Sequence, residues 1–78
     1  MNRKIRLIWD FHGADSKGTA EHHVRHLLEF MQRENLEVLR TGIFSNADFH
    51  CMATMTVNEK DVRLLRDTLR PHRAVVVE

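Results

Sequence analysis

Imidazole side chains are the chemical feature that stands out in this sequence. It has 78 residues and six histidines, and three of these, His22, His23 and His26, fall between Ala20 and His26. Residues four apart share one face of a helix, so His22 and His26 could reach one ligand. Neutral imidazole binds metals and accepts protons. The spacing therefore predicts half of a metal site, with zinc or another transition metal as the cofactor.

Asp10 and His50 form a second candidate pair. Asp10 lies near the end of an alternating apolar segment at 4–11, and His50 lies near the start of another at 49–57. If the two segments are adjacent antiparallel strands, both side chains fall on the same face at the same end of the sheet. The carboxylate could then hydrogen-bond to the ring and orient it, as carboxylates do behind metal-bound histidines.

The loop HGADSKGT, which follows the first alternating segment, is a candidate anion site. Backbone N–H groups at the start of a helix favour phosphate or carboxylate, and Lys17 would add positive charge. The two glycines have the spacing of a P-loop, but Thr19-Ala20 follows them instead of Lys-Ser/Thr. The phosphate-binding lysine is missing, so we exclude a P-loop and keep a small anion or metabolite as the possible ligand.

Hydrophobic periodicity predicts the elements that would position these residues. Apolar residues alternate with period two in the expected strands, and they recur at helical spacing in the expected helices. Asn58 is expected to cap the second helix, and Pro71 to stop it. In chain order we expect a strand at 4–11, a helix at about 19–35, strands at 37–44 and 49–57, a helix at 59–70 and a strand at 73–78.

The order of these elements, βαββαβ, predicts one α+β domain over residues 1–78. Right-handed crossovers place the first and third strands in the middle of an antiparallel sheet with the order 4-1-3-2, and both helices cover one face. This arrangement is the ferredoxin-like sandwich. An open sheet with its last strand unpaired is the alternative.

That topology would bring all six histidines to one end of the sheet. The positive end of the helix macrodipole disfavours imidazolium, so the histidines of the first helix are expected to be neutral unless Glu21 offsets the effect. The predicted ligand-binding residues are Asp10, His12, Lys17, His50 and His72, and the predicted metal ligands are His12, His22, His26 and His50. A third interpretation assigns the histidines no role beyond hydrogen bonds to turns and caps.

Composition narrows the function classes. The formal net charge is +1, so no strong field would attract nucleic acid or a membrane surface. No apolar run is long enough to span a bilayer. The single cysteine, Cys51, cannot form an internal disulfide, which favours the cytoplasm, and its strand position predicts a buried thiol.

Two apolar residues on the helix-free face, Ile8 and Met52, predict a homodimer that packs face to face. We therefore expect a small cytoplasmic ligand-binding, metal-binding or regulatory domain. The alternatives are a small enzyme that uses a histidine of this edge as general base or metal ligand, and a structural subunit without a ligand.

Overall fold

The computed structural model describes residues 3–47 and 49–77. A short 3-10 helix, η1 (Glu59–Asp61), joins the third strand to the second helix. The other elements are β1 (Lys4–His12), α1 (Ser16–Arg33), β2 (Arg40–Ala47), β3 (His50–Asn58), α2 (Val62–Leu69) and β4 (Arg73–Val76).

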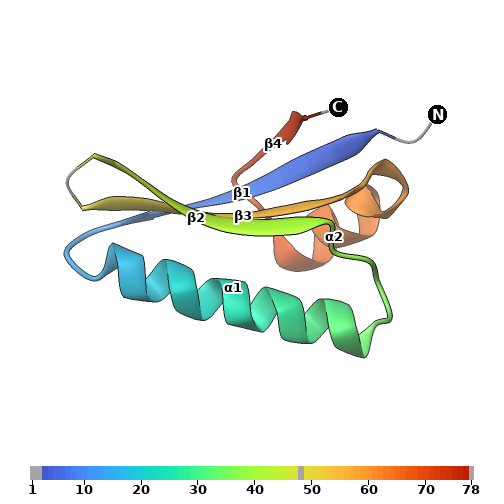
Figure 1. Cartoon of the computed structure of the whole chain (residues 1–78), viewed down its shortest axis with the longest axis horizontal. Helices are drawn as coiled ribbons and strands as arrows, with labels where there is room; N and C mark the ends of the chain where they lie inside the picture. The colour runs from blue at the N-terminus through green and yellow to red at the C-terminus, as the bar shows by residue number, and fades with distance from the viewer. Residues whose placement is uncertain (1–2, 48, 78) are drawn as a thin grey trace.

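The four strands form one antiparallel sheet with the order β2-β3-β1-β4. This is the expected order 4-1-3-2 counted from the other edge, and it is consistent with a ferredoxin-like arrangement. β4 pairs with β1 from Ile5↔Val76 to Ile8↔Arg73, so the alternative with an unpaired last strand is wrong. Figure 1 shows both helices on the same side of the sheet.

The core lies between the helices and one face of the sheet. Alternation along β1 and β3 turns Leu7 and Met55 toward the helices, and neither side chain retains exposed surface. They pack in one cluster with Leu27 of α1 and Leu65 of α2. Each fully buried side chain of this kind contributes about 1.5–3 kcal/mol to the free energy of folding. This cluster holds α1 and α2 against the sheet.

The first helix begins at Ser16 rather than near Thr19. Gly13 has a φ of 114°, which glycine adopts at no steric cost, and its carbonyl oxygen accepts a hydrogen bond from the Ser16 N–H at 3.0 Å. The chain therefore turns into the helix soon after β1. As a consequence His22 lies in the second turn of α1, beyond the first turn where the macrodipole acts.

Asn58 does not cap α2 with its side chain, contrary to expectation. The residue precedes η1 and makes no side-chain cap bond, and its Nδ2 donates to Glu37 Oε1 at 2.8 Å. α2 ends at Leu69, and Arg70 follows in the left-handed region with a φ of 50°. The helix thus stops just before Pro71, as predicted.

The face of the sheet without helices, here called the open face, differs from expectation at its centre. Ile8 retains only 7% of its surface and Met52 is half-buried, whereas Phe44 on β2 is 49% exposed. The Phe44 ring lies over Gly42, where an added Cβ would come within 2.9 Å of the ring. The exposed apolar side chains of this face therefore lie toward its edges, at Phe44 on β2 and Val75 on β4, rather than at its middle.

Candidate functional site

Asp10 is the centre of a polar cluster where β1, β3 and β4 meet on the open face. Its carboxylate accepts hydrogen bonds from Arg73 Nε at 3.1 Å and from Arg73 Nη2 at 2.8 Å. His50 Nε2 lies 3.0 Å from Asp10 Oδ1, so the predicted pairing of these two side chains is confirmed. The Asp10 N–H donates to His72 Nδ1 at 2.8 Å. We call Asp10, His12, His50, His72 and Arg73 the Asp10 cluster.

The charge of Asp10 fixes the proton positions in the cluster. Hydrogen bonds from Arg73 lower the pKa of Asp10 below its usual value of 3.8, burial opposes this effect, and His50 adds to the lowering. The carboxylate is therefore ionised at neutral pH and can only accept hydrogen bonds. His50 Nε2 must then carry the hydrogen of that bond, which leaves a lone pair on Nδ1 when the ring is neutral.

The other two rings of the Asp10 cluster have different roles. His72 Nδ1 accepts a hydrogen bond from the Asp10 N–H. A neutral His72 therefore carries its proton on Nε2 and is a donor there. His12 stacks on His50, with ring centroids 4.5 Å apart and an interplanar angle of 8°. Lone pairs lie in the ring planes, so two parallel rings do not point at one ion. The cluster offers donors and a base rather than a chelate.

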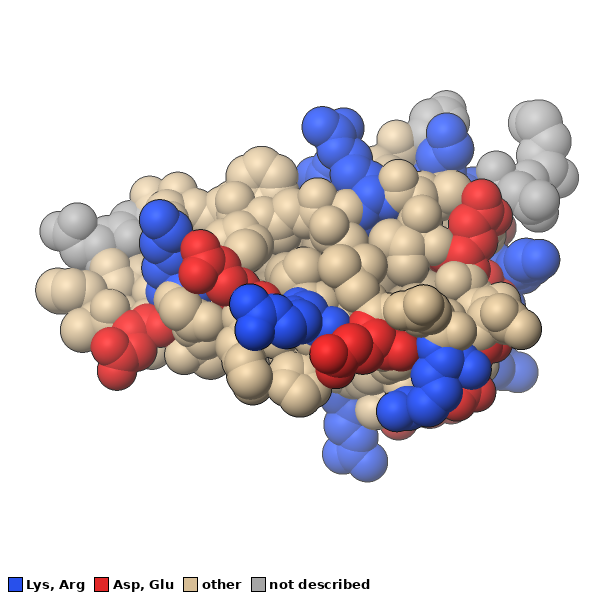
Figure 2. Space-filling model, turned by 60° about the horizontal axis from the view of Figure 1, so that its bottom comes forward, with Lys and Arg blue, Asp and Glu red and all other residues tan. Residues whose placement is uncertain are grey.

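His22 and His26 form a separate pair on the exposed side of α1. Their Nε2 atoms are 2.9 Å apart, and the rings meet edge to face with centroids 4.4 Å apart. Glu29 Oε1 lies 3.9 Å from His26 Nδ1. The expected contact across one helical turn is therefore present. On the side of the molecule shown in Figure 2, Lys and Arg alternate with Asp and Glu.

The predicted site residues thus divide into two groups. No hydrogen bond, ion pair or ring contact of the described residues joins His12 or His50 to the α1 pair. Within residues 3–47 and 49–77, no three His, Cys, Asp or Glu side chains come together as metal ligands. The set of four histidines is therefore not assembled around one point. Lys17 is exposed and makes no described contact with the Asp10 cluster.

His23 faces the core, as its position a quarter turn from His22 predicts. Its ring centroid lies 5.0 Å from that of Trp9 and 5.3 Å from that of Phe11. Its Nε2 is buried and has no hydrogen-bond partner among the described residues. Burial lowers the pKa of His23, and the charges of His26, His72 and His22 lower it further. His23 is therefore a neutral core residue at pH 7.

Cys51 is buried as predicted, with 4% of its surface exposed. Its Sγ shares a hydrogen bond of 3.3 Å with Ser45 Oγ. Hydrogen bonds with the hydroxyls of Ser16 and Ser45 lower the pKa of the thiol. Burial keeps the thiol from external electrophiles, so we assign it no nucleophilic role.

Sequence reasoning missed a group of basic residues on the open face. Lys4, Arg6 and Arg40 line a hollow of about 250 Å³ at the end of the sheet opposite the Asp10 cluster. Arg6 could be placed on this face by strand alternation alone. Arg40 could not, because its position depends on the register of β2 against β3.

No family model, no curated protein and no solved structure matches the chain. Among the described residues, no helix combines the length and the apolar character needed to cross a membrane.

Proposed function

We propose that this chain is a small ligand-binding domain that holds a divalent transition-metal ion through His22 and His26. The observation that carries the proposal is the 2.9 Å separation of the two Nε2 atoms. Two metal–nitrogen bonds of about 2.05 Å place their nitrogens about 2.9 Å apart at the right angle of square-planar or octahedral coordination. At the tetrahedral angle of zinc the nitrogens are about 3.3 Å apart, which a small rotation of these exposed rings would supply. Only one hydrogen fits between the two atoms, and a metal ion can take its place.

The surroundings of the pair favour copper, nickel or zinc. Imidazole suits these ions, and their affinities for such ligands peak at copper. The Glu29 carboxylate near His26 Nδ1 can orient that ring, as carboxylates do behind metal-bound histidines. Two protein ligands leave the remaining positions to water, so the ion would be exchangeable. A regulatory role, in which metal supply sets the stability of α1, agrees with this arrangement.

The test is a titration of untagged protein with zinc and nickel, followed by NMR of the imidazole resonances. We expect His22 and His26 to shift together, because both rings bind the same ion. His22→Ala and His26→Ala should each weaken binding by about a hundredfold, since a second tethered ligand contributes that much through effective concentration.

His12→Ala is the matched control, because it removes an exposed histidine outside the pair. Its metal affinity should equal that of the unsubstituted chain. If excess zinc leaves His22 and His26 unshifted, or if His12→Ala abolishes binding, the proposal is wrong.

A second candidate function is acid–base catalysis, favoured by the pairing of Asp10 with His50. The carboxylate orients the ring and leaves Nδ1 free as a base, which is the arrangement that general-base catalysis needs. Support would come from turnover of a substrate that is lost in His50→Ala and retained in His26→Ala. A structural subunit without a ligand is the third candidate, and it predicts that neither substitution has an effect.

Two further parts of the proposal concern context. A cytoplasmic location is supported by the single, buried cysteine, which leaves the described chain without a partner for a disulfide. A homodimer is supported by apolar side chains on the open face, although Ile8 contributes less than its sequence position indicates.

A further inference from the structure

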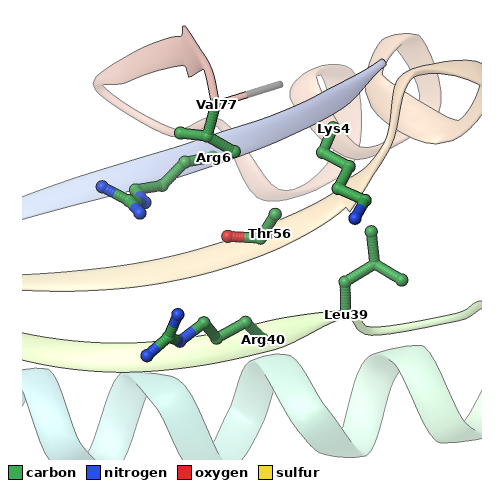
Figure 3. A pocket seen from close by; sticks show the side chains of 6 residues that line it. All are labelled: Lys4, Arg6, Leu39, Arg40, Thr56 and Val77. Carbon is green, nitrogen blue, oxygen red and sulfur yellow. The ribbon is translucent and has the colours of Figure 1, made fainter. Parts of the chain in front are cut away.

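Three cationic side chains gather around one hollow on the open face. The hollow has a volume of about 250 Å³ and is lined by Lys4, Arg6, Leu39, Arg40, Thr56 and Val77. Figure 3 shows Arg6 and Arg40 extending in the same direction along the sheet, one above and one below Thr56. Lys4 lies to the right of Thr56 in the same view. We call this group the basic hollow.

The register of the sheet produces this arrangement. Thr56 on β3 pairs with Arg6 on β1 and with Arg40 on β2, so the three residues form one row across three strands. Neighbouring strands are about 4.8 Å apart, which puts the two arginine Cα atoms about 10 Å from each other. Two long side chains at that spacing can bring their guanidinium groups to one ligand between them.

The charges of the basic hollow are not neutralised by the described residues. No described ion pair or side-chain hydrogen bond involves Lys4, Arg6 or Arg40. Three other arginines do have carboxylate partners, namely Arg73 with Asp10, Arg33 with Glu34 and Arg66 with Asp67. Like charges held together repel, so an anion that entered the hollow would relieve this repulsion.

We infer that the basic hollow binds the phosphoryl group of a small phosphate monoester. Arginine presents a fork of N–H donors that matches phosphate oxygens. Arg6 and Arg40 approach from opposite sides of Thr56, so the best ligand has oxygens on more than one side. A tetrahedral phosphoryl group meets this requirement, and a planar carboxylate meets it less well.

The ester part of the ligand would lie over Phe44. A second hollow of about 210 Å³ shares Arg6, Arg40 and Thr56 with the first, and Phe44 lines it. Phe44 is 49% exposed, and an apolar or aromatic group could cover its ring. An aromatic phosphate monoester should therefore bind more tightly than inorganic phosphate, because it fills both hollows.

The experiment compares three probes at constant ionic strength: phenyl phosphate, inorganic phosphate and benzoate. Backbone amide NMR of the full chain reports where each probe binds. We expect shifts at Arg40, Thr54 and Thr56, with affinity falling from phenyl phosphate to phosphate to benzoate. Phe44→Ala should bring the affinity for phenyl phosphate down to that for phosphate and leave phosphate binding unchanged.

Charge-removing variants provide the second measurement. Arg6→Gln and Arg40→Gln should each weaken phosphate binding by about tenfold or more, which is the effect of losing hydrogen bonds to a charged group. Arg25→Gln, on the exposed side of α1, is the matched control and should leave the affinity unchanged.

Some results would overturn the inference. One is an equal affinity for phosphate in Arg6→Gln and Arg25→Gln. The other is a set of amide shifts spread over α2 and its arginines instead of the open face. The metal site on α1 uses none of these residues, so failure here leaves that proposal intact, and loss of metal binding leaves this one intact.

Discussion

At the scale of single residues, His23 differs from its neighbours His22 and His26 because its ring faces the core instead of solvent. Its ring fills space beside Trp9 and Phe11, and its Nε2 is buried without a described partner. A buried polar atom without a hydrogen bond costs about 1–3 kcal/mol. The packing gained against two aromatic rings offsets that cost, so His23 behaves as an imperfect substitute for an aromatic core residue.

Replacing this ring should change how stability depends on pH. The pKa of His23 is lowered from 6.5 in the folded chain, chiefly by burial. The unfolded chain therefore binds the proton more readily, and stability falls as the pH drops below 6.5. His23→Phe should raise the free energy of unfolding, measured by urea titration, by about 1 kcal/mol at neutral pH. The variant should also lose less of this free energy on acidification to about pH 5.5.

His12→Phe serves as the comparison in the urea experiment, since that ring is exposed. It should leave the acid-dependent loss of stability unchanged. If His23→Phe loses as much stability on acidification as the unsubstituted chain, His23 is not the group responsible.

The residues of the Asp10 cluster were only partly predictable. Asp10 and His50 could be paired from sequence because strand alternation and an antiparallel partner fix both face and end. Arg73 could not be included, because its contact with Asp10 depends on the register of β4, a strand of four residues. Nothing in the sequence indicates which nitrogen of His72 is engaged, and that detail makes it a donor rather than a metal ligand.

At the scale of elements, periodicity predicted the type and order of the four strands and the two α-helices, but not η1 and not all the limits. β2 runs from Arg40 to Ala47 rather than over 37–44, and the expected helix at 59–70 is divided into η1 and α2. The start of α1 was placed too late because Ser16, Lys17 and Gly18 carry no apolar periodicity. Gly42 on β2 is a residue whose role in the structure the sequence alone does not indicate. A glycine weakens a strand, but at this position it leaves room for the Phe44 ring, which a Cβ would approach within 2.9 Å and displace.

The attachment of β4 provides a test at this scale. Asp10 ties β4 to β1 through Arg73 and His72, and β4 itself has no buried residue. Asp10→Asn should lower the free energy of unfolding by about 1–2 kcal/mol, because charge-assisted hydrogen bonds are lost. Hydrogen exchange should accelerate in β4 more than in β3.

The contact of Asp10 with Arg73 should also weaken in acid, but for a different reason from His23. Hydrogen bonds favour the charged form of Asp10, whereas burial disfavours the charged form of His23. The pKa of Asp10 is lowered from 3.8, so its contribution is present above that value and is lost as the pH falls through the folded pKa. Asp67→Asn removes a carboxylate from an exposed ion pair on α2 and should leave β4 unchanged. Equal exchange rates in β4 for both variants would contradict the assignment.

At the scale of the whole molecule, the open face is the surface on which we expect two chains to associate. Met52 is half-buried and Phe44 and Val75 are exposed there, which favours face-to-face packing. Arg6 and Arg40 lie on the same face and repel a second copy, so added salt should strengthen the dimer. A dimer of this kind would cover the basic hollow, so a second chain and a phosphate ligand should compete for the open face. Light scattering on dilute, untagged protein should give twice the 9.2 kDa of one chain.

Met52→Lys should give a monomer, because it places a charge at the centre of the contact. Leu64→Lys on α2 should remain a dimer, since Leu64 is 50% exposed away from the open face. A mass of 9.2 kDa for the unsubstituted chain at every salt concentration would rule the dimer out.

Trp9 gives the molecule a built-in optical reporter. It is the only tryptophan of the chain, its indole N–H donates to the Leu69 carbonyl oxygen at 2.9 Å, and the His23 ring lies against it. One fluorophore is thus in contact with β1, the end of α2 and the buried side of α1. Emission from unlabelled protein therefore senses how these three elements fit together.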